Sequence, residues 1–207
     1  MLLLENKILI SKPYQRSVDL SVCLYDGNYV VKNLAAPEDM IKAYQLRHQV
    51  FCHELGWVPP SESGLEIDDY DDHAVFFGVF DMQNRLLAHM RLITAENDFM
   101  IEREFLSLVG NGHKIRKEPD TVELTRCCVT SEARTYNIST EFGSFDIFSL
   151  LFKGIYHWCL KNDIEYVYGV TDYRVYRLLH IKGLPFKLTD KPHTMPDGVV
   201  AVGVIMN

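Results

Sequence analysis

Charged side chains stand inside two of the most apolar segments of this chain, and they restrict how those segments can pack. Arg91 interrupts the run LLAHMRLI, and Glu123 and Arg126 interrupt TVELTRCCV. A charge in such a strand is tolerated in a protein interior only when an opposite charge or hydrogen bonds accompany it. Glu123 and Arg126 are three positions apart, so a regular strand would place them on opposite faces. A bulge or a twist between them would bring both side chains into one cleft.

Negative charge is concentrated just before the apolar run that starts at residue 74. Residues 61–72 contain six acids and no base, and four of these acids are aspartates within residues 68–72. Such a stretch is a solvated loop, a calcium loop, or a site that binds a cation or orders arginine side chains. Counted from Asp68, the sixth position lacks Gly and the twelfth lacks Glu, which disfavours an EF-hand calcium loop.

The spacing of apolar residues predicts mixed strands and helices in one layered α/β or α+β domain. Alternation around DGN indicates a hairpin within residues 20–35, and the strong helical pattern at 143–162 has Ser144 as its expected cap. The other expected helices are 38–54, 102–109 and 173–182, and the other expected strands are 74–81, 85–95, 121–129, 165–171, 185–189 and 199–205.

Composition excludes several classes of protein. The net charge of −7 argues against a general nucleic-acid binder, and we expect no nucleic-acid partner. Five scattered cysteines do not form a disulfide framework, and no stretch is long and apolar enough to span a membrane. The opening MLLLENKILI lacks the pattern of a signal peptide. A reducing cytoplasm is therefore the expected location.

An ordered set of residues resembles the acyl-homoserine-lactone synthases, the LuxI-type autoinducer synthases of bacterial quorum sensing. LRHQVFCHELGW is similar to that family's N-terminal Arg, Phe and Trp signature, EIDDYDD to its acidic stretch, and VELTRCCV to its Glu-x-Ser-Arg-Phe strand. The resemblance covers roughly residues 28–205. The matching residues are Arg47, Phe51, Trp57, Asp68, Asp71, Arg91, Phe105, Glu123 and Arg126.

The resemblance implies a single domain over residues 1–207 with a fold related to the GNAT acetyltransferases, a central mixed and mostly antiparallel sheet flanked by helices. Residues 1–27 would be an N-terminal extension of unknown role. The implied reaction joins an acyl group to the amine of S-adenosylmethionine and then closes a lactone, with release of methylthioadenosine. S-adenosylmethionine would be a consumed substrate, with no cofactor or metal, and the acyl thioester would be carried by acyl carrier protein or coenzyme A.

The resemblance also implies roles for the matching residues. Glu123 would be the base that takes the amine proton, and Arg126, Asp68 and Asp71 would complete the catalytic group. Asp69 and Asp72 are expected to be solvated neighbours. The substrate-binding residues would be Arg47, Phe51, Trp57, Arg91 and Phe105, with the aromatic pair embracing the sulfonium and the adenosyl group.

Some residues depart from the family pattern and keep other functions open. Thr125 stands where Ser is usual, and Cys127 stands where an aromatic residue is usual. TSEARTYN lacks the Gly-rich turn that holds coenzyme A pyrophosphate in acetyltransferases, which weakens a plain acetyltransferase function. The alternatives are an acyltransferase that uses acyl-coenzyme A and another amine, or a catalytically silent GNAT-like binding module. His48, Cys52 and His53 lack a fourth ligand for a metal.

Residues 174–191 carry five basic residues against one acid. This stretch is either a solvated surface or the docking site of an acidic acyl carrier protein. The sequence does not specify the length or oxidation of the acyl chain, the carrier, the oligomeric state or the cognate receptor.

Overall fold

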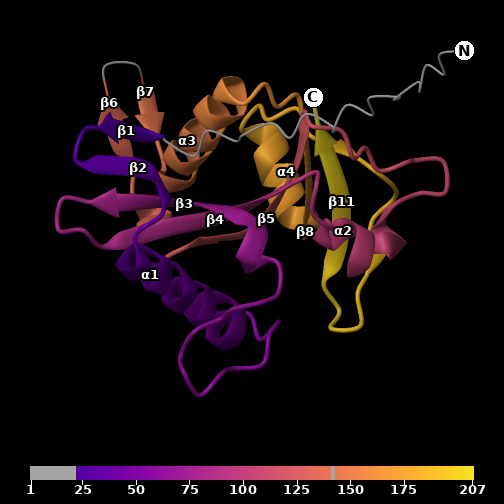
Figure 1. Cartoon of the computed structure of the whole chain (residues 1–207), viewed down its shortest axis with the longest axis horizontal. Coiled ribbons are helices and arrows are strands. Elements are labelled where there is room, and N and C mark those ends of the chain that lie inside the picture. The colour runs from indigo at the N-terminus through magenta and orange to yellow at the C-terminus, as the bar shows by residue number, and fades with distance from the viewer. Residues whose placement is uncertain (1–21, 141–142) are drawn as a thin grey trace, which may run out of the picture.

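The computed structural model describes residues 22–140 and 143–207, and within them nine strands form one sheet (Figure 1). The sheet order is β1-β2-β3-β4-β5-β8-β11-β10, and β9 pairs with β11. The strands are β1 (Cys23–Asp26), β2 (Tyr29–Leu34), β3 (Ala74–Asp81), β4 (Leu86–Thr94), β5 (Thr121–Val129), β8 (Tyr166–Asp172), β9 (Lys187–Leu188), β10 (His193–Thr194) and β11 (Val200–Met206). A separate hairpin consists of β6 (Ile138–Thr140) and β7 (Gly143–Phe145).

Helices cover both faces of this sheet. The helices are α1 (Pro37–Arg47), α2 (Met100–Arg103), α3 (Ile147–Lys161) and α4 (Tyr173–Ile181), and a π-helix (His48–Glu54) continues α1. Phe76 packs in the cluster beneath α1, while its neighbour Phe77 packs in the cluster beneath α3. Because adjacent strand residues point to opposite faces, α1 and α3 lie on opposite sides of β3. The expected layered fold with a mixed, mostly antiparallel sheet is confirmed.

The start of α1 follows the expected chemistry, but its end does not. Pro37 opens the helix and acids occupy its first turn, both of which suit a helix N-terminus. The sequence predicted one helix through residue 54, whereas the α-helix ends at Arg47 and the next seven residues are π-helical. The predicted helix near 102–109 is likewise split into α2 and a 3₁₀ turn (Leu106–Leu108).

The prediction of Ser144 as the cap of α3 is wrong. Ser144 lies in β7, and the cap is Asp146, whose carboxylate accepts a hydrogen bond from the Ser149 backbone N–H at 2.8 Å. Asp146 is the better cap because an ionised carboxylate also interacts favourably with the positive end of the helix dipole.

The strands β5 and β8 form the one parallel pair among the described strands, and they separate part-way along their length. Their pairing runs from Thr121 with Tyr166 to Leu124 with Gly169 and then stops. Beyond this point β5 continues beside β4, and β8 continues beside β11. The two strands therefore diverge toward their carboxyl ends, next to the position of Arg126.

The expected N-terminal extension is only partly described. Residues 1–21 lie outside the described residues, but residues 23–26 form β1, an edge strand that pairs with β2. No helix within the described parts of the chain is long and apolar enough to cross a membrane.

Candidate active site

A bulge in β5 turns Arg126 toward the same side as Glu123. Arg126 has a φ of 53°, in the left-handed region that is unfavourable for a side chain other than glycine. On the paired strand β4, Arg91 lies opposite Thr125 and His89 lies opposite Cys128, so three steps along β5 correspond to two along β4. The three-residue spacing left a bulge or a twist open, and the structure has a bulge.

The consequence is visible at Met100, which both side chains contact. Glu123 Oε2 accepts a hydrogen bond from the Met100 backbone N–H at 2.6 Å, and Arg126 Nη1 lies 3.6 Å from the Met100 sulfur. The bulge also changes which face of the sheet the residues of β5 point to. Val122, before the bulge, packs beneath α3, whereas Cys128, after the bulge, packs beneath α1. Without the extra residue, Val122 and Cys128 would lie on one face.

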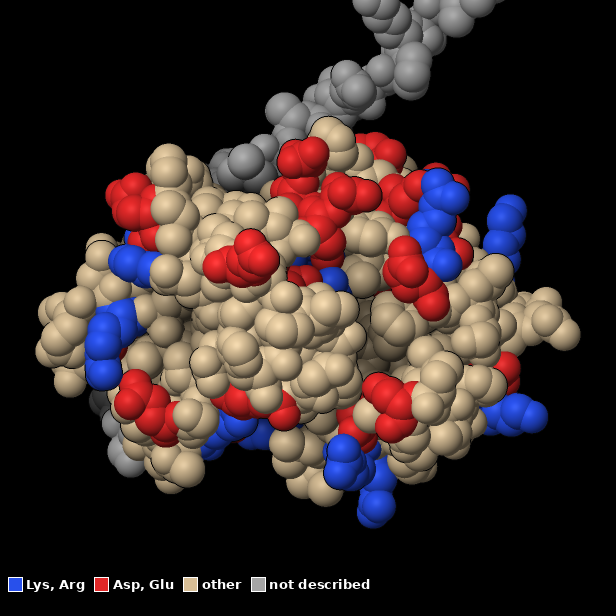
Figure 2. All heavy atoms as spheres, turned by 90° about the horizontal axis from the view of Figure 1, so that it is seen from below, with Lys and Arg blue, Asp and Glu red and all other residues tan. Residues whose placement is uncertain are grey.

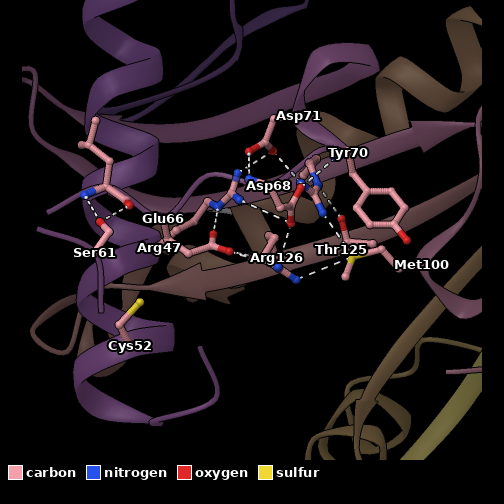
Figure 3. Close-up of polar contacts among 12 residues, drawn as sticks. Arg47, Cys52, Ser61, Glu66, Asp68, Tyr70, Asp71, Met100, Thr125 and Arg126 are labelled. Carbon is pink, nitrogen blue, oxygen red and sulfur yellow. Dashed lines mark hydrogen bonds and ion pairs between the residues drawn. The ribbon is translucent and has the colours of Figure 1, made fainter. Parts of the chain in front are cut away.

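Three arginines and three acids meet beside this bulge (Figure 3). Arg47 donates hydrogen bonds to Glu66 and, at 2.7 Å, to Asp71. Arg126 donates to Glu66 at 3.0 Å and to Asp68 at 2.7 Å. The third arginine of this charge cluster, Arg91 on β4, donates to Asp68 and Asp71 and, at 2.9 Å, to the Thr125 hydroxyl. The cluster consists of Arg47, Arg91, Arg126, Glu66, Asp68 and Asp71.

Only two members of the charge cluster are open to solvent. The side chains of Arg126 and Asp68 are 16% and 20% exposed, whereas Arg47 and Arg91 are fully enclosed. Glu66 and Asp71 are each 3% exposed. Three positive and three negative charges balance, which is what burial of so many ionised groups requires.

Ion pairing decides the protonation of the enclosed members. Burial alone would raise the pKa of Asp71, but the hydrogen bond and charge of Arg47 outweigh burial, and the pKa is lowered. Burial alone would lower the pKa of Arg47, but Asp71 and Glu66 reverse that effect and raise it. Both groups are therefore ionised, and Asp68 and Asp71 between them form ion pairs with all three arginines of the charge cluster.

Glu66 is a member of the charge cluster that the sequence reasoning missed as a site residue. It sits in the loop before β3, and it bridges Arg47 and Arg126. The signal that could have found it is its position, because Glu66 is the first acid of EIDDYDD, the stretch that resembles the acidic motif of the family. Asp69 and Asp72, by contrast, are exposed, as expected of solvated neighbours.

Glu123 is enclosed and holds the start of α2. Its two oxygens accept hydrogen bonds from the backbone N–H groups of Met100 and Ile101, at 2.6 and 2.8 Å. The side chain has no exposed surface. Burial raises the pKa of Glu123 to about 7, even though the two N–H donors and Arg91 act in the opposite direction.

The predicted aromatic residues occupy different surroundings. Phe51 is buried on the π-helix and stacks with half-exposed Trp57, with ring centroids 6.2 Å apart. The guanidinium of Arg126 lies 5.6 Å from the centre of the Phe51 ring, so the pair adjoins the exposed end of the charge cluster. Phe105 instead packs half-buried against the apolar cluster around Phe99.

An acidic hollow of about 640 Å³ borders the charge cluster on one side. Tyr70 separates the two: its ring faces Arg91 at 5.6 Å, and its hydroxyl donates to Glu104 at 3.2 Å. Burial, followed by the Glu104 charge, raises the pKa of Tyr70 to about 12. Acidic side chains also gather in the upper part of the face that Figure 2 shows.

The other candidate groups have ordinary surroundings. The ring of His48 accepts a hydrogen bond from the Ser61 backbone N–H at 3.2 Å, and His53 is exposed. Within residues 22–140 and 143–207, no group of three or more His, Cys, Asp or Glu side chains is arranged to hold a metal ion. Cys127 is an exposed free thiol beside the bulge.

Comparisons with known proteins show the family of this chain. The family model described as autoinducer synthase matches residues 32–206. A probable acyl-homoserine-lactone synthase of Sinorhizobium fredii is 27% identical over 176 residues, covering 84% of this chain and 83% of the relative. An acyl-homoserine-lactone synthase of Aliivibrio fischeri is 30% identical over 168 residues, covering 79% of this chain and 84% of the relative.

The fold also matches solved structures. The solved structure of BjaI, described as a CoA-dependent acyl-homoserine lactone synthase with MTA, superimposes with a TM-score of 0.74 at 18% identity. The match covers 86% of this chain and 82% of BjaI. At this identity the likeness establishes a shared fold.

Proposed function

Since this chain belongs to the autoinducer synthase family, we propose that it makes an acyl-homoserine lactone as a quorum-sensing signal. In this reaction the amine of S-adenosylmethionine attacks an acyl thioester, and a thiol leaves. The carboxylate of the methionine part then attacks its own γ-carbon. The C–S bond to that carbon breaks, and methylthioadenosine leaves with the bonding electron pair.

The charge cluster beside the β5 bulge is the observation that carries this proposal. It assembles side chains from α1, the acidic loop, β4 and β5 around one point, and it exposes one cation and one anion there, Arg126 and Asp68. S-adenosylmethionine carries a carboxylate, an ammonium and a sulfonium. One exposed arginine and one exposed aspartate suit such a zwitterionic substrate.

The exposed and enclosed members have different tasks in the proposal. Arg126 and Asp68 touch the substrate, with Arg126 holding its carboxylate and Asp68 attracting its cationic end. Arg47 and Arg91 have no exposed surface, so they position these two residues through Glu66 and Asp71. In this proposal Arg47, Arg91 and Asp71 position Arg126 and Asp68, and they do not contact the substrate themselves.

Glu123 is the proposed base for the amine. A pKa of about 7 places it near the working pH, where a base is most effective. The carboxylate is enclosed, and each oxygen already accepts one backbone N–H. A water molecule that reaches a remaining lone pair therefore carries the proton from the ammonium to Glu123.

Closure of the lactone depends on the folded shape of the substrate more than on acid or base assistance. Arg126 holds the attacking carboxylate, and the rings of Phe51 and Trp57 lie beside it. Their faces attract the sulfonium by cation–π interaction until the C–S bond breaks. Phe105 is kept in the proposal as a more distant wall of the substrate site.

The acyl thioester enters where β5 and β8 diverge, because their free edges lie next to Arg126. The carrier is acyl carrier protein or coenzyme A, and the basic stretch 174–191 is the proposed docking surface for an acidic carrier. Arg174 and Lys182 are tied to Asp172 and Asp146, which cap α4 and α3. Replacing these two bases would therefore disturb two helix starts as well as docking.

Arg177 and Lys191 give a cleaner test of docking, because they are exposed and have no ion pair with any residue that the structure describes. The double variant Arg177→Glu with Lys191→Glu should raise the Michaelis constant for an acyl carrier substrate at low salt. The constant for S-adenosylmethionine should stay unchanged. An unchanged carrier constant would move the docking surface elsewhere or favour coenzyme A.

A cytoplasmic location is part of the proposal, and all five cysteines, which are free thiols, suit a reducing compartment. The activity is tested by incubating the protein with S-adenosylmethionine and acyl thioesters of several lengths, followed by mass spectrometry. We expect one lactone and one methylthioadenosine per thiol released. An acyltransferase acting on another amine would release thiol without methylthioadenosine, and a binding module would release neither.

A further inference from the structure

The segment that carries Trp57 is held to the protein by a histidine that has no role in the reaction proposed above. We define this segment, residues 55–61, as the strap. It follows the π-helix (His48–Glu54) and leads into the acidic loop. Gly56 and Gly64, with φ of 65° and 70°, stand near its two ends. Both glycines are in the left-handed region, which glycine adopts without steric cost, and no atom lies within 4 Å of where a β-carbon would be. The backbone therefore changes direction at each of them without strain.

The first half of the strap is fastened by one carbonyl of the π-helix. The backbone N–H groups of Trp57 and Val58 both donate to the carbonyl of Phe51, at 2.9 and 3.2 Å. These bonds fix the backbone of Trp57 but leave its side chain half-exposed, with the ring of Phe51 as its stacking partner. The direction of the indole therefore depends on how the rest of the strap lies.

The second half of the strap is fastened by His48. The backbone N–H of Ser61 donates to Nε2 of His48 at 3.2 Å, and the His48 side chain is buried. Nε2 is the acceptor in this bond, so the neutral ring carries its proton on Nδ1. A second side-chain hydrogen bond from the π-helix to the strap is weaker, from the Cys52 thiol to the carbonyl of Pro59 at 3.6 Å.

The geometry of the aromatic pair shows why the position of the strap affects ligand binding. The ring centroids of Phe51 and Trp57 are 6.2 Å apart. A flat group between two rings needs two contacts of about 3.5–4.0 Å, roughly 7–8 Å in total. A ligand therefore lies on the outside of this pair, next to Arg126, and a small displacement of Trp57 changes the surface that the ligand meets.

We propose that His48 is a positioning residue for S-adenosylmethionine, acting through the strap: its bond to Ser61 holds Trp57 on Phe51, and this places the indole against the substrate. The proposal rests on the proposed function for the identity of the ligand. It does not rest on that function for the strap itself, because the position of Trp57 is measurable without a substrate.

The test compares three variants of His48. His48→Leu removes the acceptor, whereas His48→Gln keeps an acceptor near the position of Nε2. We expect His48→Leu to raise the Michaelis constant for S-adenosylmethionine about fivefold, the effect of one neutral hydrogen bond, with kcat changed less than twofold. His48→Gln should restore most of the affinity. If His48→Leu does not fold, His48→Asn replaces it, since the shorter side chain does not reach Ser61.

Fluorescence provides a readout that a merely structural role would not move. The chain has two tryptophans, and Trp158 is fully buried. Quenching by acrylamide, corrected with a Trp57→Phe variant, therefore reports Trp57. We expect quenching to increase in His48→Leu and to return toward the wild-type value in His48→Gln. A His193→Leu variant, changed at an exposed histidine on β10, should behave as wild type.

Several results would overturn the proposal. One is equal affinity and equal quenching in wild type and His48→Leu, and another is a His48→Gln variant as impaired as His48→Leu. A third is the same fivefold loss when His48→Leu is made in a Trp57→Leu background, which would separate His48 from Trp57. If the wild type releases no methylthioadenosine, the proposed function fails, and the quenching comparison still decides whether His48 holds the strap.

Discussion

Replacement of Glu123 by Gln should change how the stability of the protein depends on pH. Burial raises the pKa of this carboxyl from 4.5 to about 7 in the folded protein. Between these two pH values the folded chain binds the proton more tightly than the unfolded chain does. The free energy of unfolding therefore falls as pH rises through this window. The loss is about 3 kcal/mol, because one pKa unit corresponds to about 1.4 kcal/mol.

The glutamine variant lacks this titration. It also loses a hydrogen bond to the start of α2, which costs about 1–3 kcal/mol at every pH and so leaves the slope unaffected. Urea unfolding at intervals from pH 4 to pH 8 measures the difference between wild type and Glu123→Gln. That difference should move by about 3 kcal/mol in favour of the variant as pH rises.

A Glu118→Gln variant is the matched control, because it makes the same substitution at an exposed position. A constant difference for Glu123→Gln would refute the reasoning, since it would mean that the buried carboxyl titrates as it does in the unfolded chain. Turnover offers a second readout. If Glu123 is the base, turnover of the wild type should rise with pH through about 7.

The remaining predictions concern three other positions. Arg126→Lys should lose most activity because an ammonium cannot reproduce a two-pronged hydrogen bond, and near-normal turnover of the folded variant would contradict this role. Trp57→Leu should weaken the binding of S-adenosylmethionine, measured by a binding isotherm, more than it lowers the stability of the fold, measured by a thermal melt. By contrast, Trp158→Ala in the core should cost about 3–5 kcal/mol of stability. Asp71→Ala removes a negative charge that pairs with two buried arginines, and it should destabilise the protein by about 3–5 kcal/mol in urea unfolding. Asp72→Ala, at an exposed position, should change the free energy of unfolding by no more than about 0.5 kcal/mol.

Alternation along a strand predicted a bulge or a twist between Glu123 and Arg126, because it depends only on the order of residues in the chain. Glu123 and Arg126 cannot both be satisfied on one face of a regular strand, and the structure resolves this with a left-handed residue at Arg126. The buried partners of the arginines were less accessible. Asp68 and Asp71 were found, but Glu66 was not, since its pairing with Arg47 depends on how a loop folds back over α1.

The π-helix (His48–Glu54) had no signal in the sequence. A pattern of 3.6 residues per turn fits residues 38–54 well enough to predict one helix, and nothing in that pattern marks the change to a π-helix after Arg47. The short strand β10 and the β6–β7 hairpin were missed for a similar reason, since two- or three-residue strands are defined by their partners. The wrong prediction of Ser144 as the cap of α3 has a different cause, because the sequence alone already offers Asp146 as a stronger cap two residues later.

The single parallel pair among the described strands has a consequence for the order in which the chain folds. All six residues of the charge cluster lie between residues 47 and 126, in a part of the chain where each of the strands β2, β3 and β4 pairs with the strand that follows it in sequence. The pairing of β5 with β8 must wait for the crossover through α3, because parallel strands need a long connection. During synthesis, which exposes the N-terminal segments first, the proposed site for S-adenosylmethionine is therefore able to assemble on the ribosome before the proposed acyl entrance is formed.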